Sequence, residues 1–552
     1  MISSFPNFLP RDQGGEGMSR VWIVGLDGGS WNVVRPLLEG GRMPNLGALV
    51  EGGVCGVLRS TVPPVTCPAW FTFSTGLSPS RLGIYDFYSL RPGGRHLRYH
   101  SYADLQEVEF WDLLMEEGLS CGILNDPLFY PRKRHLGFAV PGFITPVDEF
   151  RSYPPGLMEE LDRATGKYEV DQEDMNIVDD ETLLEDCLRV EGKRVKALSY
   201  LLDKYPTDFF LGVFTGTDRI CHRFLNRAFL SSGRERDEAW EAIAAVYQVV
   251  DEGIGEVMER AADEDYLMVI SDHGFAPRSW NLHVNQYLSD AGLLRVKVRG
   301  WMERAGMTQR SIGKALHGLG LMRVAKRFAP RRLLDLFPRG ESILGEAMIH
   351  DLISRGRVSW EETSAVCIGY GVYLNPEAHT GEAASPGLEP RLLEQVRREL
   401  QGLVAPSGGG VLEALTPYSA YDDPHPVDPP HLILRETGDC QVRSTFAVSG
   451  DLFTPNQRAG HSEEGIFVAR HPAIPSGELE SPLSLQDLAP LILETYGIPA
   501  PAAMRGKVTP ELLPHGSARE GGDSGDVRGE RTRREKERIA ARIADMRRRG
   551  RG

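Results

Sequence analysis

Short apolar runs alternate with longer amphipathic stretches along the first half of the chain. Four continuous apolar runs have the length of β-strands, at 21–26, 120–124, 209–214 and 266–270. Helical patterns with one apolar face lie between them, at 37–50, 185–202 and 239–262. Apolar strands that alternate with helices indicate a mostly parallel sheet covered on both faces. The pattern therefore predicts an α/β fold with a three-layer α/β/α core.

The alternation changes after Phe275. Residues 276–441 hold a basic segment at 299–339, a helix at 391–403 and a Pro-rich stretch at 421–430. We interpret this region as an inserted cap beside the active site, and the basic segment as a solvated helical face. A strand at 465–469 and a helix at 485–496 then resume the core pattern.

These changes divide the chain into five parts. A first part of the catalytic core at 20–275 and a second part at 442–513 flank the inserted cap at 276–441. We expect residues 1–19 to be disordered. The tail at 514–552 has too few apolar residues to fold alone, so we expect a disordered segment or an isolated charged helix.

Composition narrows the class of protein. The 552 residues exceed the size at which one hydrophobic core stops growing. A formal net charge of -15 argues against general binding to nucleic-acid backbones, which needs Lys and Arg. Seven cysteines without CxxC spacing indicate no disulfide framework, and we expect a cytoplasmic protein. Membrane association is not expected, because no apolar run approaches the roughly 20 residues that span a bilayer.

Three of the apolar strands end in an aspartate. Asp27 directly follows the first run, and Asp272 comes two residues after the run at 266–270. Asp218 comes four residues after the run at 209–214. In an open parallel sheet, ligands bind outside the carboxyl ends of the strands. We therefore expect the three carboxylates to converge on one edge.

Histidines accompany these aspartates. His222 lies four residues after Asp218, on the same helical face, and His273 directly follows Asp272. His461 stands in a loop ahead of the strand at 465–469. Each residue alone is more simply a helix cap or a packed histidine. Together they predict a metal site, because carboxylate and imidazole are the ligands that Zn, Mn or Fe favour.

Thr66 is the candidate nucleophile. Pro68 suits the first turn of a helix that runs to Thr75 and Gly76. The plain interpretation of Thr66 is a helix N-cap, since Thr is preferred there. A hydroxyl at a helix N-terminus also faces the N–H groups and the positive dipole end that bind phosphate oxygens. Metal coordination would lower the pKa of such a hydroxyl and make it an alkoxide nucleophile.

Taken in chain order, these residues resemble the alkaline phosphatase superfamily, in its branch of type I phosphodiesterases and nucleotide pyrophosphatases. The resemblance covers roughly residues 21–513 and implies hydrolysis of a phosphate ester through a phospho-threonine intermediate on Thr66. It also implies two divalent ions, for which zinc is the first candidate and manganese the alternative, that stabilise the attacking and leaving oxygens. One ion would be held by Asp218, His222 and His461, and the other by Asp27, Thr66, Asp272 and His273.

Two departures from related patterns bear on the substrate. In nucleotide pyrophosphatases an asparagine three residues after the nucleophile holds a phosphoryl oxygen, whereas Ala69 stands here. A nucleotide substrate is therefore not implied. Sulfatases of the superfamily need a Cys-x-Pro-x-Arg motif, but Cys67 is followed directly by Pro68. The expected partner is a small-molecule phosphate monoester or diester.

Two alternatives stay open. A phosphomutase similar to cofactor-independent phosphoglycerate mutase would use serine and carry its large insertion before the later ligands, whereas here the insertion follows His273. A non-catalytic metal-binding protein with a partner-binding tail is the other alternative, against which the intact ligand set argues. Four further residues neighbour the ligands in sequence without an assigned role: Arg219, Arg278, Trp280 and His283.

Overall fold

The computed structural model describes residues 19–91, 95–129, 136–144, 152–172, 179–297, 347–354, 356–375, 378, 388–421, 429–447 and 450–514. These residues belong to one compact unit, Met1–Pro514. The expectations for the N-terminal segment, for the basic segment at 299–339 and for the tail lie outside the described residues. Among the described helices, none is both long and apolar enough to cross a membrane.

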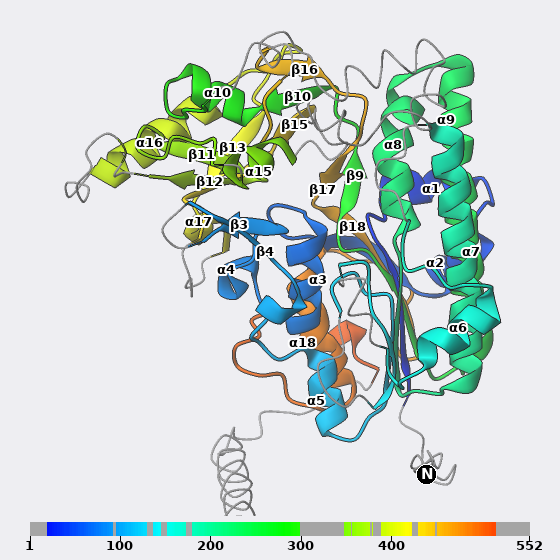
Figure 1. Ribbon diagram of the computed structural model, residues 1–552. Helices are drawn as coiled ribbons and strands as arrows, with labels where there is room; N and C mark the ends of the chain where they lie inside the picture. The colour runs from blue at the N-terminus through cyan, green and yellow to red at the C-terminus, as the bar shows by residue number, and fades with distance from the viewer. Residues whose placement is uncertain are drawn as a thin grey trace, which may run out of the picture. The chain divides into compact units, whose positions relative to one another are not determined.

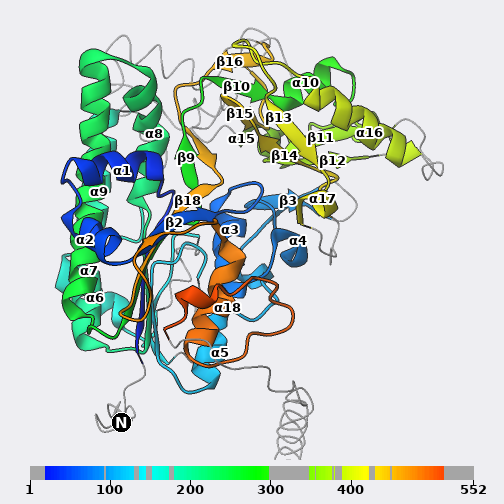
Figure 2. The same ribbon diagram turned by 180° about the vertical axis from the view of Figure 1, so that it is seen from behind.

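A nine-stranded sheet forms the centre of this unit (Figures 1 and 2). Its strand order is β19-β2-β18-β8-β1-β7-β5-β6, and β20 also pairs with β2. The strands β8, β1, β7, β5 and β6 are parallel, whereas β18 runs antiparallel to both of its neighbours. The predicted, mostly parallel sheet is confirmed. Its strands are β1 (Val21–Leu26), β2 (Val54–Arg59), β5 (Cys121–Leu124), β6 (Gly137–Val140), β7 (Phe209–Phe214), β8 (Tyr266–Ile270), β18 (Glu464–Arg470), β19 (Gly477–Glu478) and β20 (Leu483–Ser484).

Successive side chains of β1 enter two different hydrophobic cores. Trp22, Val24 and Leu26 pack with one set of helices, and Val21 and Ile23 pack with another. Since a strand alternates its side chains between the two faces of a sheet, each face is covered by helices, and the three-layer prediction is confirmed. The first set is α1 (Trp31–Glu39), α2 (Pro44–Gly52), α6 (Leu157–Thr165), α7 (Asp180–Lys204), α8 (Gly216–Leu230) and α9 (Gly233–Arg260); the second is α3 (Thr66–Thr75), α5 (Phe110–Glu116) and α18 (Leu485–Thr495).

The helix expected at 37–50 is wrong, because the structure places two helices there. The first ends at Glu39, and Gly41 takes a left-handed conformation with φ of 65°, which glycine adopts without steric cost. Pro44 then occupies the first position of α2, where its missing N–H is tolerated. Turn residues thus interrupt an apolar pattern that continues through them.

The chain builds a third hydrophobic core after β9 (Gly274–Ala276). A four-stranded sheet has the order β11-β12-β14-β13, and a three-stranded sheet has the order β15-β10-β16. The three-stranded sheet extends past residue 441, since it includes β16. The elements of this region are β10 (Trp280–His283), α10 (Val284–Asp290), α15 (Ala347–Ser354), β11 (Ala365–Ile368), β12 (Gly371–Leu374), α16 (Leu388–Gln401), β13 (Leu412–Leu415), α17 (Pro417–Tyr421), β14 (Leu432–Glu436), β15 (Cys440–Arg443) and β16 (Phe453–Pro455).

Remaining short elements complete the described fold. The strands β3 (Tyr88–Leu90) and β4 (Leu97–Tyr99) form a hairpin, and α4 (Pro79–Leu82) lies between α3 and β3 in sequence. The strand β17 (Gly460–Ser462) pairs with β9.

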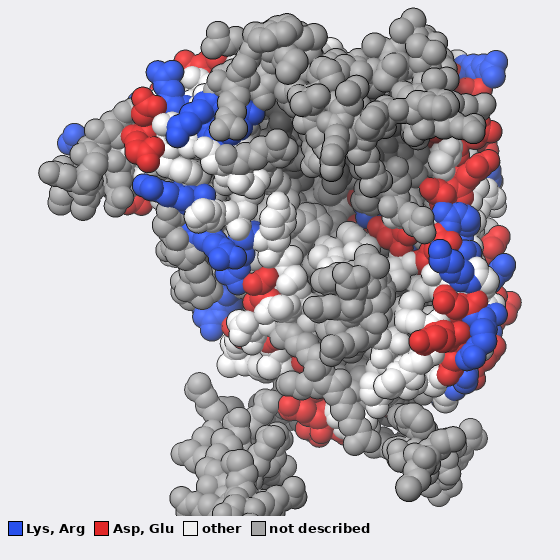
Figure 3. Space-filling model, in the orientation of Figure 1, with Lys and Arg blue, Asp and Glu red and all other residues white. Residues whose placement is uncertain are grey.

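Charged side chains of both signs are interspersed over the layer of α6, α7 and α9, at the right of Figure 3. Arg260 pairs with Asp203 and with Glu256 at 2.7 Å each, and Lys204 pairs with Glu160 at 2.5 Å. Such partly exposed pairs contribute at most about 1 kcal/mol each, because water and salt screen them. The stability of this layer therefore comes mainly from its buried face.

Candidate active site

Three aspartates meet at the carboxyl edge of the sheet. Asp27 follows β1, and its backbone N–H donates to the Phe214 carbonyl at the end of β7, at 2.9 Å. Asp218 lies in the first turn of α8, which begins two residues after β7, and Asp272 lies two residues after β8. All three are buried, with at most 2 % of their surface exposed. The convergence expected from the sequence is present.

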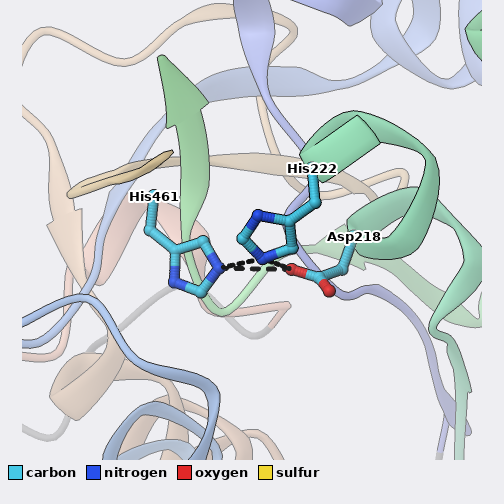
Figure 4. Close-up of side chains that lie close together, drawn as sticks. All are labelled: Asp218, His222 and His461. Carbon is cyan, nitrogen blue, oxygen red and sulfur yellow. Dashed lines mark hydrogen bonds and ion pairs between the residues drawn. The ribbon is translucent and has the colours of Figure 1, made fainter. Parts of the chain in front are cut away.

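One cluster consists of Asp218, His222 and His461 (Figure 4). The Asp218 Oδ1 atom lies 3.4 Å from His222 Nε2 and 3.3 Å from His461 Nε2. The two Nε2 atoms are 2.9 Å apart. Asp218 and His222 share one face of α8, whereas His461 reaches them from β17.

The strand β17 corrects the loop expected around His461. Gly460 to Ser462 pair antiparallel with β9, and His461 lies opposite Phe275. This register places His461 beside His273, and the centroids of the two rings are 3.8 Å apart. A Cβ added at Gly274 would come within 2.0 Å of the Glu464 carbonyl oxygen, so the close approach of the strands needs glycine there.

The second cluster consists of Asp27, Asp272 and His273. His273 Nε2 lies 3.5 Å from Asp27 Oδ1 and 3.3 Å from Asp272 Oδ2. The backbone N–H of Gly28 donates to Asp272 Oδ1 at 3.1 Å. Gly28 has a φ of 68°, and an added Cβ would come within 2.4 Å of the Phe275 ring. Only glycine fits this turn.

Thr66 is the first residue of α3, and Val65 is the N-cap. The interpretation of Thr66 as a helix cap is therefore wrong, since α3 has no side-chain cap. The Thr66 hydroxyl instead lies 3.3 Å from His273 Nε2. The predicted end of the helix is confirmed, because Gly76 terminates α3 in a left-handed conformation. Thr66 thus joins the second cluster.

The three histidines present their Nε2 atoms to the site. Each Nδ1 lies near a backbone carbonyl: Ala459 at 3.1 Å for His222, Pro64 at 2.8 Å for His461 and Gly274 at 3.2 Å for His273. A carbonyl oxygen only accepts, so each Nδ1 carries a hydrogen, and in the neutral ring each Nε2 then keeps a lone pair. Histidines that bind metal are usually oriented in this way.

The donor atoms fit divalent cations. Asp27 Oδ1, Asp218 Oδ1 and Asp272 Oδ2 are buried without a hydrogen-bond partner. Uncompensated buried acceptors are costly, and here they face imidazole lone pairs. A tetrahedral ion with bonds of about 2.0–2.1 Å holds its ligands about 3.3 Å apart. The aspartate-to-histidine distances of 3.3, 3.4, 3.3 and 3.5 Å agree with that spacing.

Burial and like charges perturb the acids of the site. Burial, together with the nearby carboxylates of Asp272 and Asp218, raises the pKa of Asp27 well above its usual value. Burial also raises the pKa of Asp272 to about 7. Burial alone would raise the pKa of Asp218, but the nearby rings of His222 and His461 and the guanidinium of Arg219 lower it below its usual value. Positive charge inside the site would stabilise the ionised forms of Asp27 and Asp272 and so lower their pKa values.

Arg219 holds the remaining oxygen of Asp218. Its Nη1 donates to Asp218 Oδ2 at 2.9 Å, and its Nη2 donates to Asp171 Oδ2 at 2.8 Å. The guanidinium also lies over the Phe143 ring, 4.9 Å from its centroid. Sequence reasoning assigned Arg219 no role, whereas the structure shows that it orients Asp218.

Two buried charges that sequence reasoning missed fix the start of α8. Glu191 and Arg194 on α7 form an ion pair at 2.5 Å with no exposed side-chain surface. Glu191 also accepts from the Gly216 N–H at 2.5 Å, and Arg194 donates to the Thr215 hydroxyl at 3.1 Å. The sequence signal was a charged pair at i,i+3 within an amphipathic helix, which ordinarily indicates an exposed face.

The other residues without an assigned role divide into two kinds. Arg278 touches the site, because its Nη2 donates to the His461 carbonyl at 3.3 Å and its Nε to Glu436 at 3.0 Å. His283 packs in the third core between the hydroxyls of Thr445 and Thr454, at 3.1 and 2.9 Å. Trp280 packs against the same core.

Comparison with known families decides the class of this site. The family of type I phosphodiesterases and nucleotide pyrophosphatases matches residues 21–327, more than half of the chain. The chain belongs to this family. It is accordingly a hydrolase that acts on phosphoric ester bonds, as the resemblance predicted. The family generally uses divalent metal ions, and the two clusters are this member's candidate sites for them.

Solved structures agree with this fold. The phosphodiesterase-family chain is similar to phosphonoacetate hydrolase from Sinorhizobium meliloti 1021 in complex with phosphonoformate, with a TM-score of 0.50 and 14% identity. The same enzyme in complex with phosphonoacetate gives a TM-score of 0.50 and 15% identity. Each comparison covers 86% of this chain and 95% of the other, and at this identity the likeness concerns the fold. No protein with a curated description matches the sequence.

Proposed function

We propose that this hydrolase cleaves small-molecule phosphate diesters or monoesters through a phospho-threonine intermediate on Thr66, at a centre of two divalent ions. The observation that carries the proposal is the position of the Thr66 hydroxyl, 3.3 Å from His273 Nε2 in a cluster of buried, unpartnered carboxylate oxygens. The stacked rings of His273 and His461 make the two clusters neighbours. The Thr66 hydroxyl thus lies in the second cluster, next to the first.

The proposed ligand sets follow the two clusters. Asp218, His222 and His461 would hold one ion, and Asp27, Thr66, Asp272 and His273 the other. Mixed nitrogen and oxygen donors favour zinc, with manganese as the alternative. When bound, the ions supply positive charge that lowers the pKa of the hydroxyl and stabilises the attacking and leaving oxygens.

The chain's own groups perform the chemistry in two displacements. The Thr66 oxygen attacks phosphorus, the ester P–O bond breaks, and the alcohol leaves with a proton. Water then attacks the phosphorus of the intermediate, and the bond to the Thr66 oxygen breaks as that oxygen regains its proton. A monoester substrate thus releases phosphate, and a diester substrate releases a phosphate monoester. The uncapped N-terminus of α3 presents N–H groups and its positive dipole end to the phosphoryl oxygens.

Substitution of the nucleophile tests the proposal. Thr66→Ala lowers kcat for a chromogenic phosphodiester by more than about a thousandfold, as removal of a nucleophile does, whereas Thr66→Ser keeps measurable turnover. Thr75→Ala is the matched control, because its buried hydroxyl donates to the Phe71 carbonyl at 2.6 Å within the same helix. Undiminished turnover in Thr66→Ala would exclude Thr66 as nucleophile.

Two further features bear on the setting of the reaction. All seven cysteines are free, which supports the proposed cytoplasmic location, where thiols stay reduced. The proposed reaction is hydrolysis rather than phosphoryl transfer to a second alcohol. With a phosphate monoester as substrate, free phosphate should therefore account for the substrate consumed when an acceptor alcohol is added, and efficient transfer without release would instead identify a phosphomutase.

A further inference from the structure

Three residues spaced by four along α8 contact one segment of the chain, residues 456–461. Asp218 lies against His461, and His222 donates from Nδ1 to the Ala459 carbonyl at 3.1 Å. One turn further, Asn226 contacts Asn456 and Arg458. The segment therefore runs antiparallel to the helix along one of its faces, and one polar side chain on each helical turn contacts the segment.

The Asn226 side chain is buried, with 4 % of its surface exposed. Its Nδ2 group donates to three backbone carbonyls, those of Arg278 at 2.7 Å, Arg458 at 2.9 Å and Asn456 at 3.3 Å. Its Oδ1 atom accepts from the Arg278 N–H at 2.9 Å. An amide offers both donors and an acceptor, so one side chain satisfies polar backbone groups on two separate segments.

Both segments lead directly to the site. The first follows β9 and carries Arg278, whose guanidinium donates to the His461 carbonyl at 3.3 Å. The second enters β17, which carries His461, and includes the Ala459 carbonyl that orients His222. Asn226 thus fixes the segment that carries His461, a proposed metal ligand. The same segment includes the Ala459 carbonyl, which orients the ring of His222, another proposed ligand.

We propose that Asn226 is a positioning residue for the ion held by Asp218, His222 and His461, an inference that rests on the proposed two-metal function. Its effect is selective for this cluster. The second cluster has separate supports, since the Gly28 N–H binds Asp272 at 3.1 Å and the Ser271 hydroxyl donates to the Gly29 carbonyl at 2.8 Å.

Asn285 provides a matched control. It is fully buried in the third core, donates to the carbonyls of Cys367 and Ser444 at 2.7 and 2.6 Å, and accepts from the Cys367 N–H at 2.8 Å. Each asparagine therefore binds backbone groups of two separate segments, Asn226 beside the cluster and Asn285 in the third core. A purely structural role predicts similar consequences for both substitutions.

The test measures zinc binding to the full chain by competition with a chromophoric chelator. His222→Ala and Asp272→Asn identify which of the two binding steps belongs to which cluster. His222→Ala is expected to abolish one binding step. Asn226→Ala is expected to lower the zinc affinity of that same step by about 10- to 100-fold, as loss of a residue that orients ligands does, and to leave the other step unchanged. Asn285→Ala is expected to change neither step.

The outcomes separate the inference from the function on which it rests. If the unsubstituted chain binds two ions and Asn226→Ala binds both with the same affinities, the inference is overturned and the two-metal proposal stands. Equal weakening of both steps in Asn226→Ala also overturns it, because the effect is then not selective. If the unsubstituted chain binds no zinc or manganese, the two-metal proposal itself fails. Should Asn226→Ala not fold, Asn226→Ser, whose hydroxyl keeps one donor, replaces it and is expected to show a smaller loss at the same step.

Discussion

The Nε2 atoms of His222 and His461 lie 2.9 Å apart, although the two residues are 239 positions apart in the chain. Each ring gives its Nδ1 hydrogen to a backbone carbonyl, so in the neutral rings two lone pairs face one another beside an unpartnered carboxylate oxygen of Asp218. Three acceptors cannot satisfy each other. A cation bound by all three atoms, as proposed, would satisfy them together.

Removal of one ligand is expected to remove one ion. His222→Ala should lower the metal content by one ion per chain, as should Asp272→Asn at the other cluster, because each site has few protein ligands. The rate of phosphodiester hydrolysis should fall at least about a hundredfold in each variant, since the lost charge contributes several kcal/mol to transition-state stabilisation. Metal analysis of the purified proteins, together with steady-state assays, measures both effects.

His283→Gln is the control for these ligand variants. His283 is also buried, but it lies between two threonine hydroxyls in the third core. Its substitution should leave both ions in place. Loss of an ion in His283→Gln, or two ions retained in His222→Ala, would contradict the assignment of the ligands.

The buried ion pair of Glu191 and Arg194 is predicted to govern stability. Arg194→Met leaves the Glu191 carboxylate buried without its partner, which should lower the free energy of unfolding by about 3–5 kcal/mol. Denaturant titration followed by circular dichroism measures the change. The exposed pair of Arg234 and Glu238 is the control, and Arg234→Ala should leave the midpoint of unfolding in place. Similar midpoints for the two variants would show that the buried pair has no special importance.

Glu109 is predicted to make stability depend on pH. Burial raises the pKa of Glu109 to about 8, although the Tyr102 hydroxyl donates to it. The folded chain therefore holds this proton up to a higher pH than the unfolded chain, whose glutamate titrates near 4.3. Stability from this group is complete below that value and is lost as pH rises through about 8.

Comparison with Glu109→Gln isolates this contribution. Gln mimics the protonated acid and does not titrate, so the variant should gain stability relative to the unsubstituted chain as pH rises from 5 to 8. Thermal unfolding across that range measures the difference in midpoint. A difference that does not change with pH would contradict the raised pKa.

The sequence alone predicted those features of the fold and site that depend on local pattern. Continuous apolar runs located β1, β7 and β8, and the topology of a parallel sheet then brought Asp27, Asp218 and Asp272 together. The start of α3 was located by Pro68, although the role of Thr66 as a cap was wrong. These inferences needed only strand length, helix periodicity and the order of the elements.

The features that the sequence did not reveal depend on pairings between distant segments. β17 has only three residues, too few for a periodic signal, and it becomes a strand because β9 lies beside it. In the sequence, Asn226 is indistinguishable from an ordinary polar residue on a helix, since its hydrogen-bond partners lie about 50 and 230 positions away. The short strands of the third core are likewise defined by each other more than by their own composition.

The stereochemical course at phosphorus tests the central claim most directly. A phosphorothioate diester of one configuration is hydrolysed in ¹⁸O-labelled water, and the configuration of the product is determined. Two successive in-line displacements, first by Thr66 and then by water, each invert phosphorus, so the account predicts net retention. Net inversion would mean a single displacement by water and would contradict Thr66 as the nucleophile.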